Sequence, residues 1–125
     1  MIQKQTRPFS DARKSGNMIF VAGQIPKDME TGEWGSDIVK QTQTCLSRIK
    51  QILADNGAEV RHIVKTTVFL TNIQDYAQMN QAYVQFFHDH GVTHDLPARS
   101  VVEVGQLMYP EWFIELDCIA VISST

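Results

Sequence analysis

The sequence predicts an α+β fold in which two helices cover one face of a mixed β-sheet. Two stretches carry apolar residues at helical spacing, and four short stretches are rich in β-branched residues. These stretches follow one another without an internal repeat or a linker. Two helices packed on one sheet make an economical two-layer sandwich. We expect residues 1–125 to form a single domain, because a chain of 125 residues can bury one core but not two.

The composition is that of an ordinary globular protein, with 43% hydrophobic and 20% charged residues. The net charge is -3, and the 11 Lys and Arg residues are scattered along the chain, so a nucleic-acid partner is not expected. The longest apolar run, residues 18–22, is too short to span a bilayer, and the amino terminus lacks the apolar core of a signal peptide. We therefore expect a cytoplasmic protein with no membrane partner.

The first third of the chain predicts strands followed by a long loop. Residues 1–17 are polar and contain turn signals, which indicates an extended lead-in that can include a short edge strand. Residues 18–22 form the first clear strand. The segment from Gly23 to Gly35 is dense in turn residues, and such a loop can line a site.

A helix is predicted from an N-cap at Ser36 to a stop at Asn56 and Gly57. Cys45 lies on its predicted core side, where cysteine is usually a small hydrophobic residue rather than a nucleophile. The full inner face consists of Ile38, Thr42, Cys45, Leu46, Ile49, Ile52 and Leu53.

A strand over residues 63–70 and a second helix follow. Asn72 and Asp75 resemble a capping box at the start of this helix, and Gly91 ends it. An aromatic stripe at this spacing is usually core packing against a sheet. The predicted stripe consists of Tyr76, Met79, Asn80, Tyr83, Phe86 and Phe87.

No metal site or disulfide is expected. Cys45 and Cys118 lack metal-ligand spacing, and a chain of this size folds without a disulfide, so both are interpreted as buried thiols. Histidines and carboxylates gather in residues 88–95, but residues two apart at a helix end point to different sides. Their convergence on one ion is therefore not implied.

The last two predicted strands, residues 96–105 and 113–121, are apolar enough to be buried, yet the first carries Arg99 near its start. A guanidinium there either pairs with an acid of the fold, namely Glu103, Glu115 or Asp117, or binds a planar anion. In the last strand, four apolar residues share one face, while Glu115 and Asp117 lie with Ile119 and Val121 on the other. A homo-oligomer that packs the mixed faces together would explain this pattern.

Several segments closely resemble the Rid family of reactive-intermediate deaminases, also called the YjgF-type family, and the likeness runs from about Pro8 to Val121. The matching segments are GNMIFVAGQIP (16–26), IVKTTVFL (63–70), Asn80, PARSVVEV (97–104) and IEL (114–116). The resemblance implies a fold similar to the small trimeric chorismate mutases and a homotrimer with sites at the subunit clefts. It also implies hydrolysis of enamines and imines to 2-oxo acids and ammonia without a cofactor or metal.

The resemblance also implies residue roles. Arg99 matches the arginine that binds the substrate carboxylate, and Glu115 matches the glutamate that positions the attacking water. Gly23 and Asn80 match substrate-binding positions. The chemistry is reasonable because a bidentate arginine can hold a small imino or 2-oxo acid in a near-attack geometry.

Three pocket positions differ from the archetypal members. Phe9 stands in place of a tyrosine, Ala22 in place of a serine and Val101 in place of a cysteine. The pocket is therefore expected to be more apolar, which favours a substrate with a bulkier side chain than 2-aminoacrylate. The loop over residues 106–112 is slightly longer and more aromatic than in the archetype.

Two other functions remain open. The same arginine and cleft would suit a non-catalytic binder of small carboxylates, and some family members are described as ribonucleases or translation inhibitors. The sequence also leaves the strand register open. If the last two strands form a simple hairpin, a shift of one residue decides whether Arg99 and Glu115 share a face.

Overall fold

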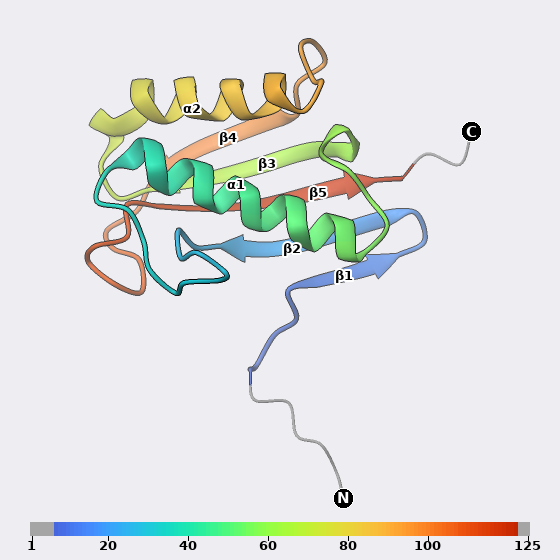
Figure 1. Ribbon diagram of the computed structural model, residues 1–125, viewed down its shortest axis with the longest axis horizontal. Coiled ribbons are helices and arrows are strands. Elements are labelled where there is room, and N and C mark those ends of the chain that lie inside the picture. The colour runs from blue at the N-terminus through green and yellow to red at the C-terminus, as the bar shows by residue number, and fades with distance from the viewer. Residues whose placement is uncertain (1–6, 123–125) are drawn as a thin grey trace, which may run out of the picture.

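The computed structural model describes residues 7–122, which form a five-stranded mixed sheet with both α-helices on one face (Figure 1). The sheet order is β1-β2-β5-β3-β4; β3 and β4 are parallel, and all other neighbouring pairs are antiparallel. The predicted α+β fold is confirmed. Its elements are β1 (Ala12–Ser15), β2 (Met18–Gln24), α1 (Ile38–Asp55), η1 (Val60–His62), β3 (Ile63–Leu70), η2 (Ile73–Asp75), α2 (Tyr76–Asp89), β4 (Ala98–Glu103) and β5 (Ile114–Val121).

The β1–β2 hairpin turns at Gly16, whose φ of 59° is readily adopted by glycine. The short edge strand is therefore present, as the lead-in indicated. Farther along, β2 bulges against β5: Val21 pairs with Cys118 and Gln24 with Leu116, so Ala22 and Gly23 lie opposite Asp117 alone. The bulge changes the direction of the chain at the end of β2.

Helix α1 starts one residue later than predicted, because Asp37 rather than Ser36 is the N-cap: its carboxylate accepts a hydrogen bond from Lys40 N at 2.8 Å. At the other end, the helix is followed by Gly57 at a φ of 78°, which confirms the predicted stop. All seven residues of the predicted inner face are buried, and Gln41 is buried beside them.

Helix α2 packs beside α1 and over the β3–β4 side of the sheet (Figure 1). Asn72 caps the short turn η2 by accepting a hydrogen bond from Gln74 N, and α2 itself begins at Tyr76. The predicted stripe is correct for Met79, Tyr83, Phe86 and Phe87, which are buried. It is wrong for Tyr76, which is 42% exposed because the first turn of α2 lies at the rim of the core.

The two last strands are not neighbours, since β3 lies between them. Strand β5 is central, and its alternation is as predicted, with Leu116 and Cys118 among the buried residues of the helix-facing side. The prediction of a buried strand is wrong for β4. As an edge strand with one neighbour, it leaves Ala98, Ser100 and Val102 exposed.

Cys45 and Cys118 are free, buried thiols, as predicted. Burial raises the pKa of both, that of Cys118 to about 12, so neither is a thiolate at neutral pH. Within residues 7–122, no group of three His, Cys, Asp or Glu side chains is arranged to hold a metal ion. In the same part of the chain, no helix has the length and apolarity needed to cross a membrane.

Gln41 joins three segments at the end of the sheet where β5 begins. Its side-chain amide donates to the carbonyls of Gly35 (2.8 Å) and Glu111 (2.9 Å) and accepts from Phe113 N (2.8 Å). Above this junction, Trp34 stacks on Tyr109 with ring centroids 5.7 Å apart, and both rings contact the buried Trp112. The loop before α1 and the loop before β5 are thereby fixed to each other.

Candidate functional site

Arg99 lies near the start of β4 and faces α2. Its Nη2 donates a hydrogen bond to the Tyr76 hydroxyl at 2.9 Å. Its guanidinium carbon is 4.7 Å from the centre of the Tyr83 ring and 5.6 Å from that of Tyr76. Tyr83 in turn is fixed by a 2.7 Å hydrogen bond to Thr66 on β3. We refer to Arg99, Tyr76 and Tyr83 as the arginine cluster.

In the part of the chain that the structure describes, no acidic side chain neutralises the charge of Arg99. Within residues 7–122 it forms no ion pair, and Glu103 instead accepts a hydrogen bond from Ile73 N at 2.7 Å. The alternative in which Arg99 pairs with an acid of the fold therefore does not hold within one chain. Aromatic faces attract a guanidinium without cancelling its charge. The arginine cluster thus presents a positive group with several unused donors, which suits a carboxylate.

Glu115 lies near the start of β5, on the sheet face opposite the helices. Its carboxyl group covers Gly23, such that Oε2 and Cδ occupy the space that a Cβ at position 23 would take. Partial burial, and secondarily repulsion from Asp117, raise the pKa of Glu115. We refer to Glu115, Gly23 and Asp117 as the glutamate cluster. It offers a carboxylate that is less well solvated than usual and therefore a stronger proton acceptor.

Strand register keeps the two clusters apart within one chain. Arg99 is level with Thr66 on β3, whereas Glu115 is level with Phe69, three residues farther along the same strand. Residues paired across a sheet share a face, and an odd step along a strand changes the face. Arg99 and Glu115 therefore lie on opposite faces. Two strand spacings of about 4.8 Å and three residues of about 3.3 Å give a Cα separation of about 14 Å.

Of the other predicted site residues, two lie near the arginine cluster, one lies beside the glutamate cluster, and Phe9 lies at neither. Asn80 is half-buried on α2, between the two tyrosines of the arginine cluster, and Val101 follows Arg99 on the helix-facing side of β4, where it packs against the core. Ala22 is in the bulge beside Gly23, and its N–H donates to Asp11 O at 2.9 Å. Phe9 precedes β1, is 53% exposed, and has the guanidinium of Arg7 5.4 Å from its ring centre.

Tyr76 is the polar residue at this site that the sequence interpretation assigned to the core instead. Its spacing did contain a signal, because positions 76, 80 and 83 lie on one side of a helix. Combined with Asn80, this spacing places three polar residues on one side of the helix. The sequence alone could not show that this side of α2 contacts Arg99. The hydrogen bond from Arg99 to the Tyr76 hydroxyl shows it.

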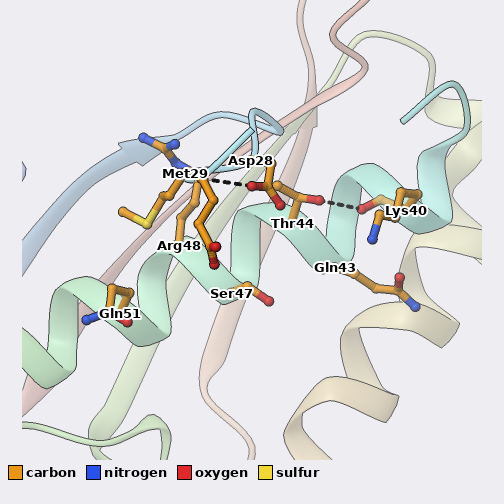
Figure 2. A pocket seen from close by; sticks show the side chains of 9 residues that line it. Asp28, Met29, Lys40, Gln43, Thr44, Ser47, Arg48 and Gln51 are labelled. Atoms are coloured by element: carbon orange, nitrogen blue, oxygen red, sulfur yellow. Dashed lines mark hydrogen bonds between the residues drawn. The ribbon is translucent and has the colours of Figure 1, made fainter. Parts of the chain in front are cut away.

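A separate groove of about 440 Å³ lies between the loop after β2 and the outer side of α1 (Figure 2). Arg48 lines this groove and donates hydrogen bonds to Gln24 Oε1 (3.0 Å) and to the carbonyl of Lys27 (2.7 Å). None of the predicted site residues lines the groove. Its lining is Asp28, Met29, Glu30, Lys40, Gln43, Thr44, Ser47, Arg48 and Gln51.

Comparison with known proteins identifies the family. Residues 2–122 match the protein family described as Endoribonuclease L-PSP. A 2-iminobutanoate/2-iminopropanoate deaminase of Escherichia coli is 41% identical over 114 residues, which cover 91% of this chain and 87% of the relative. The chain belongs to the Rid (YjgF-type) family.

Other members of the Rid family show the same likeness over nearly the whole chain. A RutC family protein of Pyrococcus abyssi is 44% identical over 118 residues, covering 94% of this chain and 88% of the relative. The crystal structure of E. coli TdcF with bound serine has a TM-score of 0.88 and 37% identity, and the match covers 95% of this chain and 91% of that one. A Rid family protein of this fold therefore binds a small molecule that carries a carboxylate.

Proposed function

We propose that this chain hydrolyses 2-imino and 2-enamino acids to 2-oxo acids and ammonia without a cofactor. The observation that carries the proposal is the pair of clusters: a guanidinium that has no acidic partner among residues 7–122 and a half-buried carboxylate with a raised pKa. The 41% identical relative named as an imine deaminase supports the same reaction.

Arg99 is proposed to bind the substrate carboxylate. The guanidinium has five N–H donors, and one of them is used on Tyr76. A second edge of the fork is then available to both carboxylate oxygens, which fixes the direction of the neighbouring C=N bond. Such positioning contributes to rate because it replaces a random encounter by a fixed geometry.

Glu115 is proposed to position and deprotonate the attacking water. Water adds to the electrophilic carbon of the imine, and its proton passes to the carboxylate. The carboxyl group delivers this proton to the nitrogen, which gives a carbon that carries a hydroxyl and an amino group. Glu115 then takes the hydroxyl proton and passes it to the amino nitrogen, the C–N bond breaks with its electrons on nitrogen, and ammonia leaves as the hydroxyl oxygen becomes the carbonyl of the 2-oxo acid. An enamine enters this sequence by tautomerisation, in which its carbon gains a proton and its nitrogen loses one, and the imine forms.

The site is proposed to form between copies of the chain in a homotrimer. Because Arg99 and Glu115 lie on opposite faces and about 14 Å apart, one site needs Arg99 from one copy and Glu115 from the next. The sheet face that carries Glu115 also exposes Phe20 (41%) and Val102 (43%), as expected of a face that a second copy covers. With Phe9 and Ala22 in the pocket, we expect a preference for larger, more apolar side chains.

The test is hydrolysis of imines produced in situ by an amino-acid oxidase, using a panel of amino acids from alanine to leucine and phenylalanine. Purified protein is expected to accelerate 2-oxo acid release, and Arg99→Ala to abolish this acceleration. Hydrolysis that stays at the uncatalysed rate over the whole panel would refute the proposal. If calorimetry then still showed binding of 2-oxo acids, the chain would be a carboxylate-binding protein. Cleavage of RNA that depends on neither Arg99 nor Glu115 would indicate a contaminating nuclease.

A further inference from the structure

We propose that Tyr76 is a second ligand of the substrate carboxylate, acting beside Arg99. This inference rests on the proposed function, since it concerns the same carboxylate. It assigns a binding role to a residue that the periodicity of α2 places in the core. The structure instead shows the Tyr76 hydroxyl 2.9 Å from Nη2 of Arg99, at a position where the side chain is 42% exposed.

The hydrogen bond leaves the Tyr76 hydroxyl with one unused capacity. A guanidinium can only donate, so the phenol oxygen is the acceptor in this contact. The hydroxyl hydrogen remains, and within residues 7–122 it is directed to no acceptor. An anion that binds to the guanidinium beside Nη2 comes within reach of this hydrogen. Arg99 and Tyr76 can therefore donate to the same carboxylate group.

The surroundings hold both donors in place. Tyr83 is 2% exposed and hydrogen-bonded to Thr66, and the centre of its ring lies 4.7 Å from the guanidinium carbon of Arg99. The centre of the Tyr76 ring lies 5.6 Å from the same carbon. Neither ring carries a charge that competes with the substrate. The geometry thus favours binding of a carboxylate over binding of the uncharged amide of the same acid.

This assignment also compensates for a feature of the sequence. Phe9, Ala22 and Val101 lack the polar groups that the archetypal family members place in the pocket. The Tyr76 hydroxyl returns one hydrogen-bond donor, located at the carboxylate end. A substrate would then be held firmly by its carboxylate, while the rest of the pocket accepts an apolar side chain.

The experiment measures the dissociation constants of 2-oxobutanoate and of its amide by calorimetry. Tyr76→Phe keeps the ring and the fold but removes one charge-assisted hydrogen bond to the carboxylate. We therefore expect 2-oxobutanoate to bind about tenfold more weakly and its amide to bind with unchanged affinity. In steady-state imine hydrolysis, KM rises by the same factor while kcat is kept. The matched control is Ser47→Ala, which removes an exposed hydroxyl from the outer side of α1 and should bind both ligands like the wild type.

Two outcomes overturn the Tyr76 proposal: a loss of carboxylate affinity smaller than threefold, or an equal loss for the amide, which would indicate a purely structural role. Arg99→Ala, measured in the same way, reports on the proposed function separately. If Arg99→Ala abolishes binding while Tyr76→Phe leaves it intact, only the role of Tyr76 is refuted. If Arg99→Ala binds the carboxylate like the wild type, the proposed role of Arg99 is refuted whatever Tyr76 does.

Discussion

The opposite placement of Arg99 and Glu115 leads to a quantitative prediction about mixed oligomers. We consider two variants, Arg99→Ala and Glu115→Gln, each expected to be inactive alone. In a cyclic trimer, each proposed site takes Arg99 from one copy and Glu115 from the next. A trimer that contains both variants, in either ratio, then has one site at which an intact Arg99 meets an intact Glu115.

The expected activity follows from random assembly. With equal amounts of the two variants, about three quarters of the trimers are mixed, and each has one working site in three, so the mixture should show about one quarter of wild-type activity. Co-expression with two different affinity tags allows the mixed trimers to be purified, and these should reach about one third. The assay is imine hydrolysis per mole of chain, with trimer composition checked by native mass spectrometry.

The control replaces Glu115→Gln by the double variant Arg99→Ala/Glu115→Gln. Mixtures of this double variant with Arg99→Ala contain no intact Arg99 and should stay at the background rate. Background activity in verified mixed trimers of the two single variants would refute the reasoning, because it would mean that both residues must come from the same chain. The strand register, from which the separation of about 14 Å was obtained, would then not describe the active assembly.

Four further predictions concern the glutamate cluster and the loop junction. Gly23→Ala should lower kcat with little change in thermal stability, because the new Cβ displaces the flexible carboxyl end of Glu115 and meets no backbone atom. A large loss of thermal stability alongside the loss of kcat would contradict this. The carboxylate of Glu115 is the proposed base and its pKa is raised, so activity should increase with pH through a value above the usual 4.3 or so for glutamate. Asp117→Asn removes a negative charge that raises the pKa of Glu115, so the rise of activity with pH should move to lower pH. A kcat/KM profile that does not shift would show that Asp117 does not repel the Glu115 carboxylate. Gln41→Ala removes three hydrogen bonds from a fully buried amide and should cost about 3 kcal/mol in urea unfolding, whereas the exposed Gln43→Ala on the same helix should cost almost nothing.

The elements with strong local patterns could be predicted from the sequence. The inner face of α1 and the alternation of β5 follow from helical and strand periods, which depend on neighbours a few residues away. The prediction that residues 96–105 form a buried strand was wrong because burial of a strand is not set by its local pattern. Whether a strand lies at the centre or the edge of a sheet depends on pairing between distant segments, and here β3 separates β4 from β5.

The same limit applies to the candidate site. The strand patterns singled out Arg99 and Glu115 as charged residues in apolar strands, and their roles came from resemblance to a family. No local pattern could indicate that they face opposite sides of the sheet. The helical spacing of Tyr76 from Tyr83 is correct, but the core position inferred from it is not. The structure adds that the first turn of α2 lies at the rim, where a ring can contact a guanidinium and solvent together.

The position of β5 has a consequence for how the protein is made. Within residues 7–122, the last strand in sequence is the central one, and it joins the β1–β2 hairpin to the parallel pair β3–β4. During synthesis, both halves of the sheet therefore leave the ribosome before the strand that unites them, and each exposes the edge that β5 will occupy. Unpaired strand edges of this kind promote aggregation. The sheet is complete only when β5 is in place, so Glu115, the proposed base, enters the fold with the strand that joins the two halves.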